Sequence, residues 1–84
     1  MSKITAIIVD DERLARENLR LLLSEFCPEV EIIGTGKNVE EARVLIAEKK
    51  PEAIFLDIRM PSGEEGLDLL EDVKSNNFQI VFVT

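Results

Sequence analysis

Three short apolar runs each end in oxygen-bearing side chains, and this repeated pattern constrains the fold more than any other feature of the chain. The runs, each with the polar residues that follow it, are 4–9 with Asp10 and Asp11, 53–56 with Asp57, and 80–83 with Thr84. Apolar runs without polar alternation are typical of parallel strands that are buried on both faces. Ligands bind beyond the carboxyl ends of such strands, so the sequence predicts that these side chains converge at one edge of a sheet.

The segment after the first run has the spacing of an amphipathic helix. Its apolar face is predicted from four residues, Ala15, Leu19, Leu22 and Phe26. Arg13 and Arg16 are predicted on the outer face, and Arg13 keeps two interpretations, because it either offsets the nearby acidic residues or faces solvent. Pro28 ends this helix, since proline has no N–H with which to continue it. Residues 30–33 then predict a second short strand, which ends near Gly34 and Gly36.

A second helix is predicted over Val39–Lys49, with Asn38 as its N-cap and Glu41 as the capping-box partner. Pro51 prevents this helix from continuing, and the third strand follows. A third helix is predicted from the apolar spacing of Leu67, Leu70 and Val73. Residues 79–83 predict a fourth strand.

Strands that alternate with helices predict right-handed βαβ units, and therefore a parallel sheet with helices on both faces. The predicted fold class is α/β, a doubly wound parallel sheet. The acidic residues of the first and third strands meet only if these strands are neighbours, which the order 2-1-3-4 provides at its switch point. A chain of 84 residues is predicted to form one domain, residues 1–84.

The composition excludes several classes of function. A net charge of −7 argues against contact with nucleic acid. Only six residues separate Lys3 from Asp10, too few for a signal peptide or a membrane-spanning helix, so we expect a cytoplasmic protein without membrane contact. The chain contains no histidine, which excludes a histidine base or metal ligand. The single cysteine, Cys27, is predicted to be a buried helix end rather than a reactive thiol.

Carboxylates that share one pocket repel one another unless a proton or a cation neutralises them. Oxygen ligands with room for water and phosphate oxygens favour Mg²⁺, with Mn²⁺ as a substitute. A single aspartate at a strand end is more often a helix cap or a solvated loop residue. Asp10, Asp11 and Asp57 occupy two such strand ends, and together they favour a metal site.

Three stretches of the chain together resemble the receiver domain of two-component response regulators. They are IIVDDE at 7–12, IFLDIRMP at 54–61 and VFVT at 81–84, in the order and spacing of that family. The first helix also resembles receivers that carry LytTR-type DNA-binding output domains. The resemblance implies a flavodoxin-like receiver fold, a signalling module rather than an enzyme, a sensor histidine kinase as partner, and a longer parent protein that regulates transcription or another output.

The resemblance also implies a role for each matching residue. Asp57 matches the phosphoacceptor, which takes a phosphoryl group from the kinase in a Mg²⁺-dependent reaction. Asp11 and Asp57 match the side-chain ligands of the metal, and Asp10 matches the acid that holds a metal-bound water. Arg59 would contribute its backbone carbonyl to the metal, and the Thr84 hydroxyl would bond to the phosphoryl oxygen and report phosphorylation.

Two departures from the family pattern affect these expectations. The loop between Pro61 and Gly66 is one residue longer than usual. The family continues beyond the position of Thr84 with a fifth strand, two helices and a lysine that pairs with the phosphoryl group, for which Lys3 and Lys74 are not substitutes. We therefore expect a C-terminally truncated receiver with impaired phosphorylation.

Truncation would leave the fourth strand as an apolar edge and would uncover one face of the sheet, and both features favour self-association as a homodimer or larger assembly. An alternative function is an interaction or dimerisation fragment that keeps the receiver fold but accepts no phosphate. A haloacid-dehalogenase-type phosphatase is a third possibility. It is disfavoured because it needs an acid two residues after Asp57, where this chain has Arg59.

Overall fold

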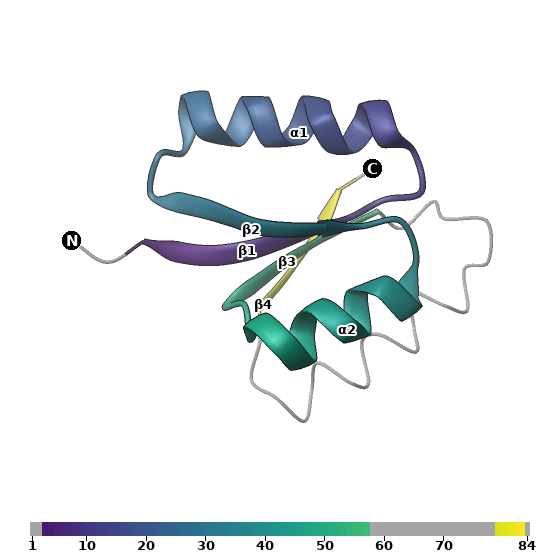
Figure 1. Ribbon diagram of the computed structural model, residues 1–84. Coiled ribbons are helices and arrows are strands. Elements are labelled where there is room, and N and C mark those ends of the chain that lie inside the picture. Colours follow the sequence, from purple (N-terminus) through teal and green to yellow (C-terminus); the bar gives the residue numbers. More distant parts are fainter. Residues whose placement is uncertain (1–2, 58–78, 84) are drawn as a thin grey trace.

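The computed structural model describes residues 3–57 and 79–83 of the chain (Figure 1). The described elements, in chain order, are β1 (Ile4–Val9), α1 (Arg13–Phe26), β2 (Val30–Gly36), α2 (Val39–Lys49), β3 (Ala53–Asp57) and β4 (Gln79–Val83). The predicted third helix on Leu67, Leu70 and Val73 lies outside the described residues. Within the described ranges, no helix combines the length and the apolar character that a membrane crossing needs.

The strands form one parallel sheet in the order β2-β1-β3-β4. Figure 1 shows α1 on one face of this sheet and α2 on the other, which is the α/β arrangement predicted from the alternating pattern. The neighbouring positions of β1 and β3 agree with the prediction from their acidic ends. Because all of the pairs are parallel, the carboxyl ends of the strands lie at the same edge of the sheet.

The core lies mainly between the sheet and α2. Alternate residues of a strand point to opposite faces, and the α2 side of the sheet and the inner face of that helix together form the main buried cluster. Its members are Ile7, Val9, Val39, Ala42, Ile46, Ile54 and Leu56. The side chains of Ile7, Val9, Ile54 and Leu56 are fully buried, so β1 and β3 are the rigid centre from which the acidic residues project.

The buried face of α1 differs from the predicted one. Leu23 is its buried residue, whereas Leu22 is 53% exposed and Phe26 is 71% exposed. Leucines occupy positions 19, 21, 22 and 23, so the apolar spacing is compatible with more than one helix face. The face that packs on the sheet contains Leu19, which was predicted, and Leu23, one turn further on. Two other predicted residues, Leu22 and Phe26, lie at the margin of this face.

The start of α2 confirms the predicted N-cap. The Asn38 Oδ1 atom accepts a hydrogen bond from the Glu41 backbone N–H at 2.8 Å. The Glu41 carboxylate reaches back one residue further than a standard capping box, because it accepts the backbone N–H of Lys37 at 2.9 Å. The helix ends at Lys50, whose φ of 47° lies in the left-handed region, and Pro51 follows.

The second strand is longer than predicted, because it continues through the glycines to Gly36. Ala6 pairs with Ile32 but Ile7 pairs with Gly34, so Ile33 is an extra residue that forms a bulge in β2. A side chain at Gly36 would place its Cβ atom 3.2 Å from the Cβ atom of Glu41 and 3.3 Å from the backbone nitrogen of Ala42. Glycine therefore allows the start of α2 to lie directly against the end of β2.

Candidate metal centre

The register of the two central strands brings the acidic residues together. Val9 of β1 is paired with Leu56 of β3, so the residues that follow them, Asp10 and Asp57, lie side by side at the carboxyl edge of the sheet. The backbone N–H of Asp10 donates to the carbonyl of Gly36 at 3.0 Å, which ties the end of β1 to the end of β2. The acidic pair is thus fixed by backbone pairing on both sides of β1.

Asp11 joins this pair to form a cluster of three carboxylates. One carboxylate oxygen from each of Asp10, Asp11 and Asp57 lies within 4.8 Å of the others. The three residues differ in burial. Asp57 is only 6% exposed, Asp10 is half-buried and Asp11 is exposed. The cluster is therefore a negatively charged site that extends from a buried carboxylate to an exposed one.

The electrostatics of Asp10 reflect this crowding. Burial raises the pKa of its carboxyl group above the usual value, and the negative charges of Asp57 and Asp11 raise it further. A hydrogen bond from the Glu12 backbone N–H to the Asp10 Oδ1 atom, at 2.9 Å, lowers the same pKa and only partly offsets these effects. The ionised cluster is therefore a strained arrangement that a cation would relieve.

The donor set fits a hard divalent cation. All three groups supply carboxylate oxygens, and their separations allow more than one of them to contact a single ion. Mg²⁺ binds through one or two carboxylates and keeps several water ligands, so it does not require a closed cage of protein atoms. The graded exposure of the cluster leaves its outer side accessible to water and to phosphate oxygens.

The structure brings together three of the five predicted site residues. Asp10, Asp11 and Asp57 meet at one edge of the sheet, as the strand-end pattern predicts. Arg59 and Thr84 lie outside the described residues.

The structure separates the two arginines, Arg13 and Arg16, that were predicted on the outer face of α1. The Arg13 guanidinium is 81% exposed and pairs with Glu17 at 3.1 Å on the helix surface, which decides for the solvent-facing interpretation. Arg16 was predicted to be outward, but it is half-buried, and its Nη1 atom donates to the Asp10 carbonyl at 2.7 Å. The sequence carries no signal that distinguishes Arg16 from an outward cation, because this contact depends on how the loop of residues 10–12 folds back on the helix.

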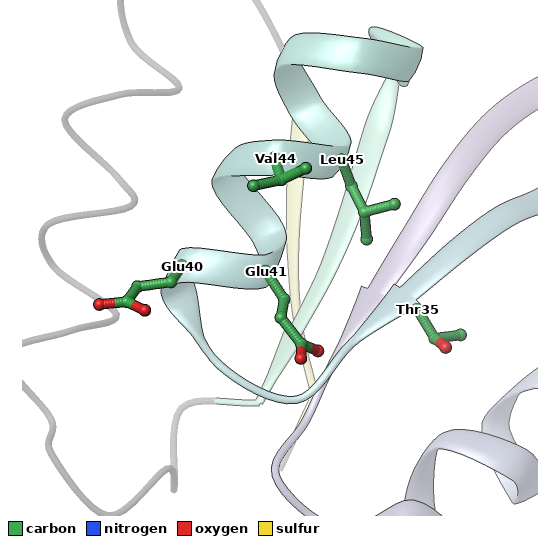
Figure 2. Close-up of a pocket in the computed structure, with 5 residues that line it drawn as sticks. All are labelled: Thr35, Glu40, Glu41, Val44 and Leu45. Carbon is green, nitrogen blue, oxygen red and sulfur yellow. The ribbon is translucent and has the colours of Figure 1, made fainter.

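A surface hollow lies away from the acidic cluster, between the end of β2 and α2. It has a volume of about 430 Å³ and is lined by Thr35, Glu40, Glu41, Val44 and Leu45. Figure 2 shows Glu41 and Leu45 extending from α2 toward β2, whereas Glu40 points away from that strand. The Glu41 carboxylate is already used in the cap of α2. The acidic cluster therefore remains the better candidate for chemistry.

Comparison with known families agrees with the fold and with this cluster. The response regulator receiver domain family matches residues 6–84. The chain belongs to this family. Its members are signalling modules rather than enzymes, and an acidic triad of this kind is typical of the Mg²⁺ site of a receiver.

Several relatives of this receiver chain are regulatory proteins from bacteria. A response regulatory protein of Vibrio cholerae is 42% identical over 83 residues, which covers 96% of this chain and 34% of the relative. The transcriptional regulatory protein BtsR of Salmonella typhimurium is 43% identical over 83 residues, with the same shares covered. The chain thus spans about a third of the length of the curated relatives it matches.

Solved receivers have the same architecture. The signal receiver domain of the response regulator NarL from Mycobacterium tuberculosis superposes with a TM-score of 0.84 at 27% identity, covering 98% of this chain and 66% of that domain. The BeF₃-activated conformation of SdrG from Pseudomonas melonis superposes with a TM-score of 0.79 at 25% identity, covering 98% and 69%. The flavodoxin-like sheet and both described helices are therefore those of a receiver.

Proposed function

We propose that this chain is the phosphoacceptor module of a two-component response regulator, and that Asp57 accepts a phosphoryl group from a sensor histidine kinase. One observation carries the proposal, which is that Asp57 ends the central strand β3 nearly buried, with two more carboxylates within 4.8 Å. A carboxylate needs no deprotonation at neutral pH to act as a nucleophile. Transfer breaks the phosphorus–nitrogen bond of a phosphohistidine and forms a phosphorus–oxygen bond to Asp57.

The proposed roles of the other residues follow from the needs of this transfer. Mg²⁺, when bound, supplies the positive charge that offsets the phosphoryl oxygens. Asp11 and Asp57 would hold the ion directly, and Asp10 would hold one of its water ligands. We assign the backbone carbonyl of Arg59 to the metal and the hydroxyl of Thr84 to the phosphoryl oxygen on the family resemblance alone.

The place of the module in a larger protein is also a proposal. Residues 1–84 would act as one receiver unit of a cytoplasmic regulator, and the relationship to BtsR and similar proteins supports a transcriptional output of the LytTR type. The net charge of −7 supports signalling by protein contact rather than direct DNA binding by this segment.

Phosphorylation by a small donor tests the function directly. The chain would be incubated with Mg²⁺ and acetyl phosphate, and intact mass would be measured with and without EDTA. In line with the expected impairment, we expect partial conversion to a species heavier by one phosphoryl group. The conversion should require Mg²⁺, disappear in Asp57→Asn, and persist in the matched surface variant Glu31→Gln. A folded chain that binds Mg²⁺ but gains no mass would contradict the proposal and would favour the alternative of an interaction fragment.

We also propose self-association, through the outer edge of β4 or the sheet face beside α1. Among the described strands, β4 pairs with β3 alone. Large apolar side chains are exposed along α1, namely Leu14, Leu21, Leu22 and Phe26. Such a surface gains free energy when a second copy covers it.

Sedimentation velocity at micromolar concentration measures this association. We expect dimers or larger species for the wild-type chain and a shift toward monomer for Phe26→Glu. A well-folded monomeric wild type at these concentrations would show that neither surface recruits a second copy.

A further inference from the structure

An arginine near the start of α1 reaches back to the loop that carries two of the clustered acids. The Arg16 Nη1 atom donates to the carbonyl oxygen of Asp10 at 2.7 Å, and this bond is partly shielded from solvent. The backbone N–H of the same arginine donates to the carbonyl of Glu12 at 3.1 Å. One residue therefore holds both ends of the loop of residues 10–12, which joins β1 to α1.

The carbonyl that Arg16 contacts has a particular place in this loop. It belongs to the peptide unit between Asp10 and Asp11, and a peptide unit is planar and moves as one body. Fixing its oxygen fixes the plane, and the plane sets the direction of the N–Cα bond of Asp11. Two other contacts hold the groups on either side of this plane. The Asp10 N–H donates to the carbonyl of Gly36, and the Glu12 N–H donates to the Asp10 carboxylate. The Glu12 contact holds the next peptide plane, and the two planes together set the direction in which the Asp11 side chain leaves the backbone.

We propose that Arg16 is a positioning residue of the metal site, which orients Asp11 by holding the carbonyl of Asp10. A charged donor on a carbonyl makes a short, strong bond, and partial burial protects it from competition by water. The inference rests on the proposed function, since it assumes that the three acids bind Mg²⁺. Arg13 provides the contrast, because its side chain is 81% exposed and its guanidinium pairs with Glu17 on the surface of the same helix.

Metal affinity of matched variants tests the role. Mg²⁺ binding would be measured by isothermal titration calorimetry for wild type, Arg16→Met, Arg16→Lys and the control Arg13→Met. Loss of a group that orients a metal ligand typically weakens affinity by roughly 10-fold to 100-fold, and we expect about 10-fold for Arg16→Met. We expect no change for Arg13→Met. Arg16→Lys should recover part of the affinity, because a single N–H donor is sufficient for one carbonyl.

A second measurement does not depend on the metal. Amide hydrogen exchange in the metal-free chain reports how firmly the loop is held, and we expect faster exchange at the Glu12 N–H in Arg16→Met but not in Arg13→Met. If Arg16→Met fails to fold, Arg16→Lys and Arg16→Gln provide the same comparison. Wild-type affinity and wild-type exchange in the folded Arg16 variants would overturn the proposal. If the wild-type chain itself binds no Mg²⁺, the proposed function fails, and the exchange data still decide whether Arg16 holds the loop.

Discussion

Replacing Asp10 by asparagine should stabilise the metal-free chain. The change removes one negative charge from the cluster but keeps an oxygen that can accept the Glu12 N–H, which now lies 2.9 Å from Oδ1. At 4.8 Å, the largest separation in the cluster, two unit charges repel by about 1 kcal/mol in water and about 3 kcal/mol at an effective dielectric constant of about 20. Asp10 takes part in two such pairs, one with the buried Asp57 and one with the exposed Asp11.

The expected net gain is smaller than the sum of these repulsions, because the hydrogen bond from Glu12 loses its charged acceptor. Water and salt largely screen the repulsion from the exposed Asp11, so the repulsion from the buried Asp57, about 3 kcal/mol, dominates. Subtracting about 1 kcal/mol for the difference between a charged and a neutral acceptor leaves a net stabilisation of about 2 kcal/mol for Asp10→Asn. Urea denaturation in EDTA at pH 7 measures this, and an unfolding slope of about 1 kcal/mol per molar urea gives a midpoint shift of about 2 M. Glu31→Gln, an exposed substitution on β2 with the same change in net charge, serves as the control.

The effect of Asp10→Asn should depend on pH and on metal. The pKa of Asp10 is raised in the folded chain, so the folded state binds this proton more tightly than the unfolded state does. As the pH falls through the raised pKa, wild-type Asp10 becomes neutral and the advantage of the variant vanishes. Saturating Mg²⁺ should make the wild type more stable than Asp10→Asn, because only the wild type keeps all three carboxylates of the metal site. A variant no more stable than wild type in EDTA at pH 7, with Glu31→Gln unchanged, would refute the reasoning.

Three further results are expected. Asn38→Ala should destabilise the chain by about 1 kcal/mol because the Glu41 N–H loses its cap, whereas Asn38→Asp should be nearly neutral, as measured by thermal or urea unfolding. Ile54→Ala should cost about 2–5 kcal/mol because this side chain is fully buried, whereas Val44→Ala, at 53% exposure, should change the unfolding midpoint little. The apparent Mg²⁺ affinity should fall with decreasing pH, starting above the range of an ordinary aspartate, because a proton on Asp10 competes with the ion; a pH-independent affinity down to about pH 4 would contradict this.

The elements with a single strong signal were predictable from sequence. The first strand and the second helix have the expected bounds. Ile4–Val9 is a short apolar run in which Thr5 is the one polar residue, and Val39–Lys49 has a cap at one end and Pro51 after the other. The meeting of the acids was also predictable, since it needs only the parallel sheet and the neighbouring positions of the first and third strands.

Features that depend on tertiary packing were not predictable. The glycines at 34 and 36 indicated the end of a strand, but pairing with β1 carries β2 through them to Gly36. The predicted apolar face of α1 included Leu22 and Phe26, and only contact with the sheet selects Leu23 instead. Arg16 resembled any other outward cation, because its bond to the Asp10 carbonyl depends on how closely the loop folds back on the helix.

The bulge at Ile33 has a consequence for comparing receiver sequences. A one-residue insertion in a regular strand turns every later side chain to the opposite face, and a bulge absorbs the extra residue where it occurs. In this chain the pairing resumes at Gly34 and reaches Gly36 beside Val9, so the end of the strand stays aligned with the acidic edge. Relatives that lack the extra residue should therefore align with their gap inside the second strand, and a gap placed in the turn before the second helix would mismatch the residues that face the core.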